Sequence, residues 1–172
     1  MRWPEPIWPR AVPTSIVVGL ATCGALGRRM KAPGTWGSVI GLLYFTACYA
    51  HVSVIGVLIA SALGSYLAVG FCGEAEVRMG VRDPGSIVLD EIVAIPLCFL
   101  GWHSVMYTLG VPAWVVFGLG FALFRLYDIA KPFGIRRLQF LPGGWGVVLD
   151  DTAAALATCA TLHLGAWAWT LR

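Results

Sequence analysis

Long apolar stretches alternate with short connections in this sequence, and the charged residues are confined to every second connection. The apolar stretches are Trp36–Ala50, Val52–Phe71, Ile92–Tyr107, Val111–Leu126 and Thr152–Trp169. Several are shorter than the ~20 residues that cross a typical bilayer core, so they span only where the bilayer thins or flanking residues snorkel. The alternation predicts an all-α polytopic membrane helix bundle with about five membrane-embedded helices.

Composition agrees with a membrane protein. Charged residues make up 12% of the 172 residues, whereas soluble domains carry about 25%. The net charge of +3 comes without a dense basic run, which argues against a nucleic-acid partner. The length predicts a single domain over residues 1–172, in which the proline-rich residues 1–13 form a loosely ordered tail.

The placement of charge also predicts the orientation. The connections near His51 and over residues 101–110 carry no Lys, Arg, Asp or Glu. Counting alternate crossings puts the charged loops on one side, which the positive-inside rule makes cytoplasmic. This count requires that Ala11–Gly27 does not cross, so we expect this segment to form an interfacial or half-inserted helix.

Two acidic pairs stand beside apolar stretches. Asp90 and Glu91 close the motif "DPGSIVLDE", which begins at Asp83, and early in a helix they point about 100° apart. We therefore expect one of them to ligate while the other braces or caps; the helix dipole alone is an equally good explanation. Asp150 and Asp151 close "GGWGVVLDD". Capping of a helix explains one of these aspartates and leaves the second unexplained.

A stripe of charge follows the fourth apolar stretch. Arg125, Asp128 and Lys131 recur every three residues in "FRLYDIAKPFG" and share one face of a helix. The stripe is compatible with surface ion pairs. Two cations that flank a carboxylate also suit a phosphate beside a metal ligand.

The segment "APGTWGS" offers a second place for an anion. Gly34 and Gly37 permit close backbone approach, and Thr35 and Ser38 supply hydroxyl groups where a helix is predicted to start. Free N–H groups at a helix start suit phosphate, and Lys31 lies just upstream. Ordinary capping by Thr or Ser is the alternative.

Together these motifs predict a metal and phosphate site. The carboxylates on the charged side are Asp83, Asp90, Glu91, Asp128, Asp150 and Asp151. Oxygen-rich sites suit Mg²⁺ or Mn²⁺, and the neighbouring cations suit an anion. No Lys, Arg, Asp or Glu lies in the middle of an apolar stretch, which argues against an ion pathway. Phosphate chemistry on a lipid is the resulting prediction.

Four blocks resemble the phosphatidylglycerophosphatase A family in their order and spacing. They are "PGTWGS", "DPGSIVLDE", "FRLYDIAKPFGIR" and "GGWGVVLDD". The resemblance implies a Mg²⁺-dependent phosphatase of the bacterial inner membrane that converts phosphatidylglycerophosphate to phosphatidylglycerol and inorganic phosphate. It also implies an all-helical fold with a central helix. Glu74 and Glu76 match none of the blocks, so we leave them outside the predicted site.

The predicted roles of the carboxylates follow from this hypothesis. One or two Mg²⁺ are held directly or through water by Asp90, Glu91, Asp150 and Asp151. Asp128 joins them as a ligand or orients Lys131, and Asp83 orients or deprotonates the attacking water.

The predicted phosphate-binding residues come from two segments: Lys31, Thr35, Gly37, Ser38, Arg125 and Lys131. Two alternative functions are a CDP-alcohol-type lipid phosphotransferase and a non-enzymatic membrane transporter or scaffold. The first lacks its D-G-x₂-A-R…G-x₃-D-x₃-D pattern here, and transport lacks charged residues at mid-membrane depth.

Overall fold

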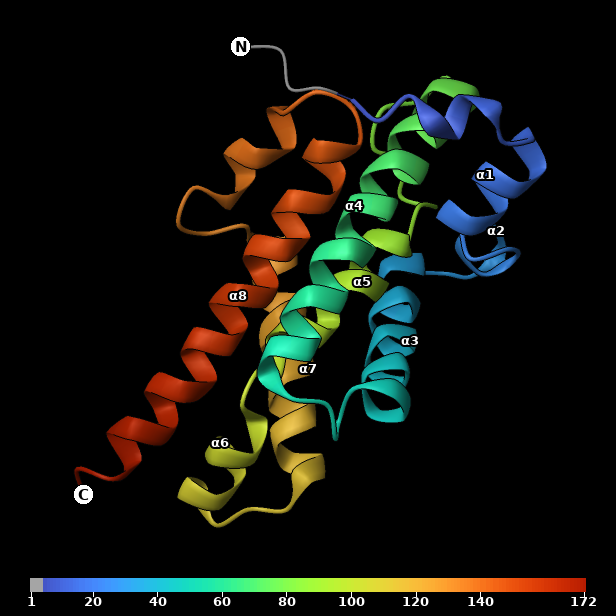
Figure 1. Ribbon diagram of the computed structural model, residues 1–172. Helices are drawn as coiled ribbons and strands as arrows, with labels where there is room; N and C mark the ends of the chain where they lie inside the picture. Colours follow the sequence, from blue (N-terminus) through green and yellow to red (C-terminus); the bar gives the residue numbers. More distant parts are fainter. Residues whose placement is uncertain (1–4) are drawn as a thin grey trace.

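The computed structural model describes residues 5–172, and within that range the chain forms helices and no strands (Figure 1). This confirms the all-α prediction. In chain order the elements are η1 (Trp8–Ala11), α1 (Thr14–Ala21), α2 (Leu26–Arg29), α3 (Pro33–Cys48), α4 (Val54–Met79), α5 (Leu89–Cys98), α6 (Trp102–Leu109), α7 (Ala113–Ala130), η2 (Ile135–Phe140) and α8 (Gly144–Trp169).

Among the described residues, three helices are long and apolar enough to cross a membrane. They are α4, α7 and α8, and the bent pair α5 and α6 would make a fourth span. The pair bends by 52°, because Pro96 lies inside α5 and Gly101 adopts a left-handed conformation before α6. At 16 residues, α3 is shorter than α4, α7 and α8. The structure therefore supports three or four spans, fewer than the five embedded helices expected.

The charged connections gather at one end of the bundle. In Figure 1 the α4–α5 loop, the α7–α8 connection and the α1–α2 region lie at the upper end. The α3–α4 turn, α6 and the C-terminus lie at the lower end. The structure thus places the charged connections at one end of the bundle, as the sequence predicted.

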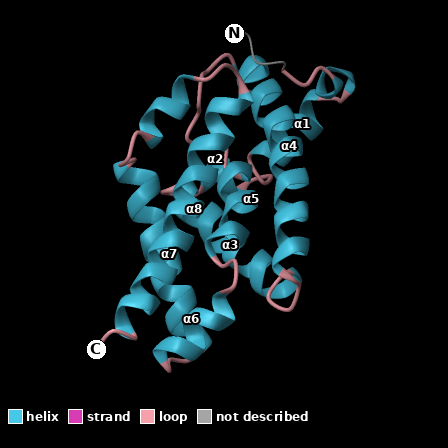
Figure 2. Ribbon diagram, turned by 60° about the vertical axis from the view of Figure 1, so that its left-hand side comes forward, coloured by secondary structure: helices cyan, strands magenta, loops and turns pink. Residues whose placement is uncertain are grey.

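Helix α5 lies at the centre of the bundle. It packs against α3, α4 and α8, which surround it in Figure 2. Its buried residues include both acids of its first turn, and they are Asp90, Glu91, Ala94, Ile95, Pro96, Leu97 and Cys98. The fold therefore has the central helix that the resemblance implied, with the acids at its beginning.

The N-terminal segment differs from the loosely ordered tail that we expected. Residues 1–4 lie outside the described residues. From residue 5 onward the segment packs on α4: the Trp8 ring meets Phe71 edge-on with centroids 5.1 Å apart. Arg78 donates from Nη1 to the carbonyl oxygen of Val12 at 2.7 Å. A guanidinium that is largely withdrawn from water needs several acceptors, and this segment supplies three further ones for Arg78.

Helix α1 is too short to span a bilayer by itself. Its eight residues extend about 12 Å. It packs against α4, and Val17 and Ala21 are fully buried there. The segment is consistent with a non-crossing N-terminal region, although its depth in a membrane stays a prediction.

Glycine allows α4 and α8 to approach closely. A Cβ on Gly73 would lie 2.7 Å from the backbone nitrogen of Gly144, and one on Gly144 would collide with the carbonyl oxygen of Val69. These neighbours are backbone atoms and cannot rotate away. The first turn of α8 is therefore fixed against α4.

We expect Gly144→Ala to separate α4 from α8 and to lower the free energy of unfolding by about 1–3 kcal/mol, as overpacking does. The matched control is Gly165→Ala in the same helix, where a Cβ meets nothing within 4 Å. Thermal unfolding in detergent micelles measures both. Equal midpoints for the two variants would contradict the close approach.

Candidate active site

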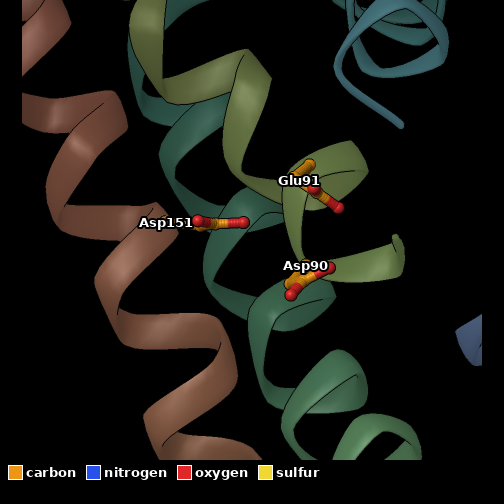
Figure 3. Close-up of side chains that lie close together, drawn as sticks. All are labelled: Asp90, Glu91 and Asp151. Atoms are coloured by element: carbon orange, nitrogen blue, oxygen red, sulfur yellow. The ribbon is translucent and has the colours of Figure 1, made fainter. Parts of the chain in front are cut away.

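Three buried carboxylates from two helices converge. Asp90 and Glu91 lie in the first turn of α5, and Asp151 lies on α8. They are 7%, 8% and 4% exposed. One oxygen from each lies within 4.8 Å of the others. Figure 3 shows the Asp151 side chain pointing from α8 towards the α5 pair. Both acids of the α5 pair thus turn an oxygen to the same point, and the division into one ligating and one bracing acid stays a prediction.

Helix α8 begins earlier than the apolar stretch at Thr152 suggested. It starts at Gly144, so Asp150 and Asp151 lie inside the helix and neither caps it. The N-cap is Gly143, with φ 54° and ψ −148°, a conformation that glycine adopts readily. The helix therefore starts within "GGWG", before the acids, and Asp150 and Asp151 lie buried in its second turn.

The stripe predicted on α7 forms a chain of ion pairs. Arg125 Nη1 lies 2.7 Å from Asp128 Oδ2, and Lys131 Nζ lies 3.6 Å from Asp128 Oδ1. Lys131 also bonds to Asp150, and Arg125 lies 3.9 Å from Glu91 Oε1. The stripe thus faces the buried acids, which a surface ion-pair stripe would not do.

Lys131 occupies the C-cap position of α7 with a left-handed backbone, φ 45°. Burial disfavours its charge, but the bond with Asp150 and the nearby Asp151 and Asp128 carboxylates outweigh burial. The pKa of Lys131 consequently lies above its ordinary value. Its ammonium therefore stays protonated at neutral pH.

A cavity of about 190 Å³ collects the predicted acids. Its wall comes from the α4–α5 loop and from α3, α5, α7 and α8. The charged residues that line it are Asp83, Asp90, Glu91, Asp128, Lys131, Asp150 and Asp151. The six carboxylates predicted from three separate segments thus share one cavity.

The beginning of α3 packs against two residues of the site, Glu91 and Arg125. A Cβ on Gly34 would collide with Glu91 Oε1, and one on Gly37 would lie 3.1 Å from Glu91 Oε2. The fully buried Ser38 accepts a hydrogen bond from Arg125 Nη1 at 3.3 Å. The two glycines therefore make room for Glu91, and Ser38 holds Arg125.

Of the predicted phosphate-binding residues, only Lys131 lines the cavity itself. Gly37, Ser38 and Arg125 lie behind its wall, next to Glu91 or to one another. Lys31 is exposed ahead of α3, and Thr35 is half-buried in its first turn; neither lines the cavity. Sequence reasoning also left out Glu76 and Gln139, which both bond to Asp83. No motif spacing could have identified them, since they come from other elements.

The acids fit a divalent cation. Asp90 Oδ1, Glu91 Oε2 and Asp150 Oδ1 are buried without a hydrogen-bond partner. A buried carboxylate is costly unless it is paired or coordinates a metal. Six carboxylates line the cavity, and Arg125 and Lys131 supply two positive charges beside them. All the donors are oxygen atoms, the ligand type that Mg²⁺ prefers.

Comparison with known proteins shows the family to which the chain belongs. The family model described as Phosphatidylglycerophosphatase A matches residues 19–166. The chain belongs to the phosphatidylglycerophosphatase A family. The matched region contains the cavity residues from all of its elements.

Relatives support the assignment. The Phosphatidylglycerophosphatase A of Haemophilus influenzae is 38% identical over 126 residues, 73% of each chain. That of Escherichia coli K12 is 30% identical over 143 residues, 81% of this chain and 77% of the relative. A protein of Bacteroides thetaiotaomicron, named Putative phosphatidylinositol-3-phosphatase, is 29% identical over 161 residues, 90% of this chain and 96% of its own. No solved structure matches the chain significantly.

Family membership identifies the chain as a phosphatase enzyme. The sequence-based resemblance is therefore confirmed, and so is the choice of an enzyme over a transporter or scaffold. The acidic cavity is the candidate active site because it brings the family-like blocks together around groups suited to phosphate chemistry.

We expect Asp151→Asn to raise the free energy of unfolding by about 1–3 kcal/mol in buffer with a chelator, because it removes one of three buried acids that crowd together. The matched contrast is Glu74→Gln, since Glu74 is paired with Arg78 at 2.8 Å and its loss should lower stability. Thermal unfolding in detergent micelles distinguishes the two signs. A fall in midpoint for both variants would contradict the repulsion argument.

Proposed function

We propose that this protein hydrolyses phosphatidylglycerophosphate to phosphatidylglycerol and inorganic phosphate with the help of one or two Mg²⁺. The observation that carries the proposal is the convergence of three buried carboxylate oxygens within 4.8 Å, beside Arg125 and Lys131, in a member of this family. The relatives from H. influenzae and E. coli carry the name of this activity.

Asp90, Glu91 and Asp151 would hold the cation, and Asp150 would join them directly or through water. When bound, Mg²⁺ supplies countercharge and Lewis-acid polarisation of phosphate oxygens. Asp128 serves as a positioning group, since it lies between Arg125 and Lys131 and orients both. Of the two roles predicted for Asp128, ligand or orienting group, we propose the orienting one.

Lys131 and Arg125 bind the phosphate. Phosphoryl transfer passes through a loose transition state with charge spread over three oxygens, so positioned cations stabilise it. Asp150 and Asp128 hold the Lys131 ammonium, while Ser38 and Asp128 hold the Arg125 guanidinium. Their side chains are thus oriented before substrate arrives, and Lys31 attracts the anionic headgroup from outside.

Asp83 lies at the exposed edge of the same cavity. In our proposal its carboxylate orients the attacking water or accepts its proton, as a general base does. It is suited to this because it is exposed and its carboxylate is paired with neither Lys131 nor Arg125.

The membrane arrangement is part of the proposal. The charged end faces the cytoplasm of a bacterial inner membrane, in accordance with the positive-inside rule. Helix α3 is a fifth embedded helix, and the α1–α2 region lies at the interface. The lipid tails stay in the inner leaflet while the headgroup reaches the cavity at the charged end.

We expect Asp90→Asn and Asp150→Asn each to reduce phosphate release at least about 100-fold, a loss typical of a missing electrostatic contact in the transition state. The assay uses purified protein in mixed micelles with phosphatidylglycerophosphate and measures free phosphate; Glu74→Gln is the control. A parallel arm with phosphatidylinositol 3-phosphate tests headgroup choice. Near-normal turnover in both Asn variants contradicts the site.

We expect Mg²⁺ to stabilise the wild-type protein by about 2.7 kcal/mol at 100 times its dissociation constant. Asp90→Asn should lose this stabilisation, because the amide that replaces the Asp90 carboxylate is a weaker ligand for the cation. Thermal unfolding with and without Mg²⁺ measures it independently of activity. A wild-type midpoint that does not respond to Mg²⁺ or Mn²⁺ would contradict a metal site.

A further inference from the structure

Asp83 adopts a backbone conformation that requires support. It lies in the loop between α4 and α5 with φ 46°, in the left-handed region that non-glycine residues populate sparsely. Such a conformation persists only where the surroundings hold it. Two side chains from separate elements contact Asp83 there.

Glu76 supports the backbone of Asp83 from α4. Its Oε1 accepts the Asp83 N–H at 2.5 Å. The last turn of α4 ends at Gly80, whose left-handed conformation reverses the chain. The Glu76 side chain therefore links the end of α4 to Asp83 and holds this part of the loop beside the cavity.

Gln139 supports the carboxylate of Asp83 from η2. Its Nε2 donates to Asp83 Oδ2 at 3.4 Å. Arg82 ties the two segments together, because its Nη2 donates to the carbonyl oxygen of Gln139 at 2.9 Å and of Leu141 at 3.4 Å. One carboxylate oxygen of Asp83 is thus engaged by Gln139, which directs the second to other partners.

We propose that Glu76 and Gln139 are positioning residues of the phosphatase reaction, which together hold Asp83 at the mouth of the acidic cavity. This inference rests on the proposed role of Asp83. Glu76 sets the backbone, Gln139 sets the rotation of the carboxylate, and the remaining oxygen faces the attacking water. A displacement of about 1 Å in a reacting group can cost about 100-fold in rate, so the clamp acts on turnover.

The test compares Glu76→Ala, Glu76→Gln and Gln139→Ala. We expect Glu76→Ala to lower kcat about 10–100-fold with KM unchanged. Glu76→Gln keeps an acceptor oxygen and should recover most of this loss. Gln139→Ala should lower kcat less, because its bond is longer. Stabilisation by Mg²⁺ should persist in all three, which shows that the buried acids remain assembled.

A double-mutant cycle with Asp83→Asn separates positioning from general structural damage. Residual turnover is measured with radiolabelled phosphatidylglycerophosphate. If Glu76 acts through Asp83, Glu76→Ala adds less than about twofold to the loss in the Asp83→Asn background, since coupled residues are non-additive. A full additional loss there, or a raised KM with unchanged kcat, overturns the clamp.

The outcome also distinguishes the two levels of the argument. An inactive Asp83→Asn variant beside a fully active Glu76→Ala variant overturns the clamp and leaves the proposed function standing. Full turnover in Asp83→Asn overturns the role of Asp83 and the clamp with it. Glu74→Gln, two residues away on α4 and paired with Arg78, is the matched control and should keep wild-type kcat once corrected for folded fraction.

Discussion

Repulsion among buried carboxylates is the constraint on which the rest of the site depends. Asp90, Glu91 and Asp151 bring oxygens within 4.8 Å of one another in the interior. Like charges at that distance repel strongly where water is excluded. Arg125 and Lys131 of the neighbouring α7 segment offset part of this negative charge. The carboxylate oxygens also suit a divalent cation, which would offset more of it. A folded state that tolerates such a cluster has given up stability for chemistry.

Close backbone packing makes the cluster possible. Gly73 and Gly144 let α8 lie directly against α4, which places the second turn of α8 beside the first turn of α5. Gly34 and Gly37 leave space for Glu91 at the beginning of α3. Side chains larger than hydrogen at these positions would push the helices apart, and the acids could no longer share one point.

The position of the cavity explains how one small protein can act on a lipid phosphate. The cavity lies among the charged connections at one end of the bundle, while the apolar surfaces of α4, α7 and α8 remain available to lipid tails. A phosphate headgroup can therefore meet cations and carboxylates without entering the apolar middle. Within the cavity, Asp83 is exposed, whereas Asp90, Glu91, Asp150 and Asp151 are buried.

The sequence by itself determined the helical class, the end of the bundle that carries charge, and the residue types that line the candidate site. Hydrophobic periodicity, helix breakers and residue types are local properties, so these predictions needed no tertiary contacts. Only the tertiary structure decided that α8 begins at Gly144, that Asp90 and Glu91 converge, and that Glu76 and Gln139 contact Asp83. Each of these depends on the distance between segments remote in sequence, and backbone packing sets that distance.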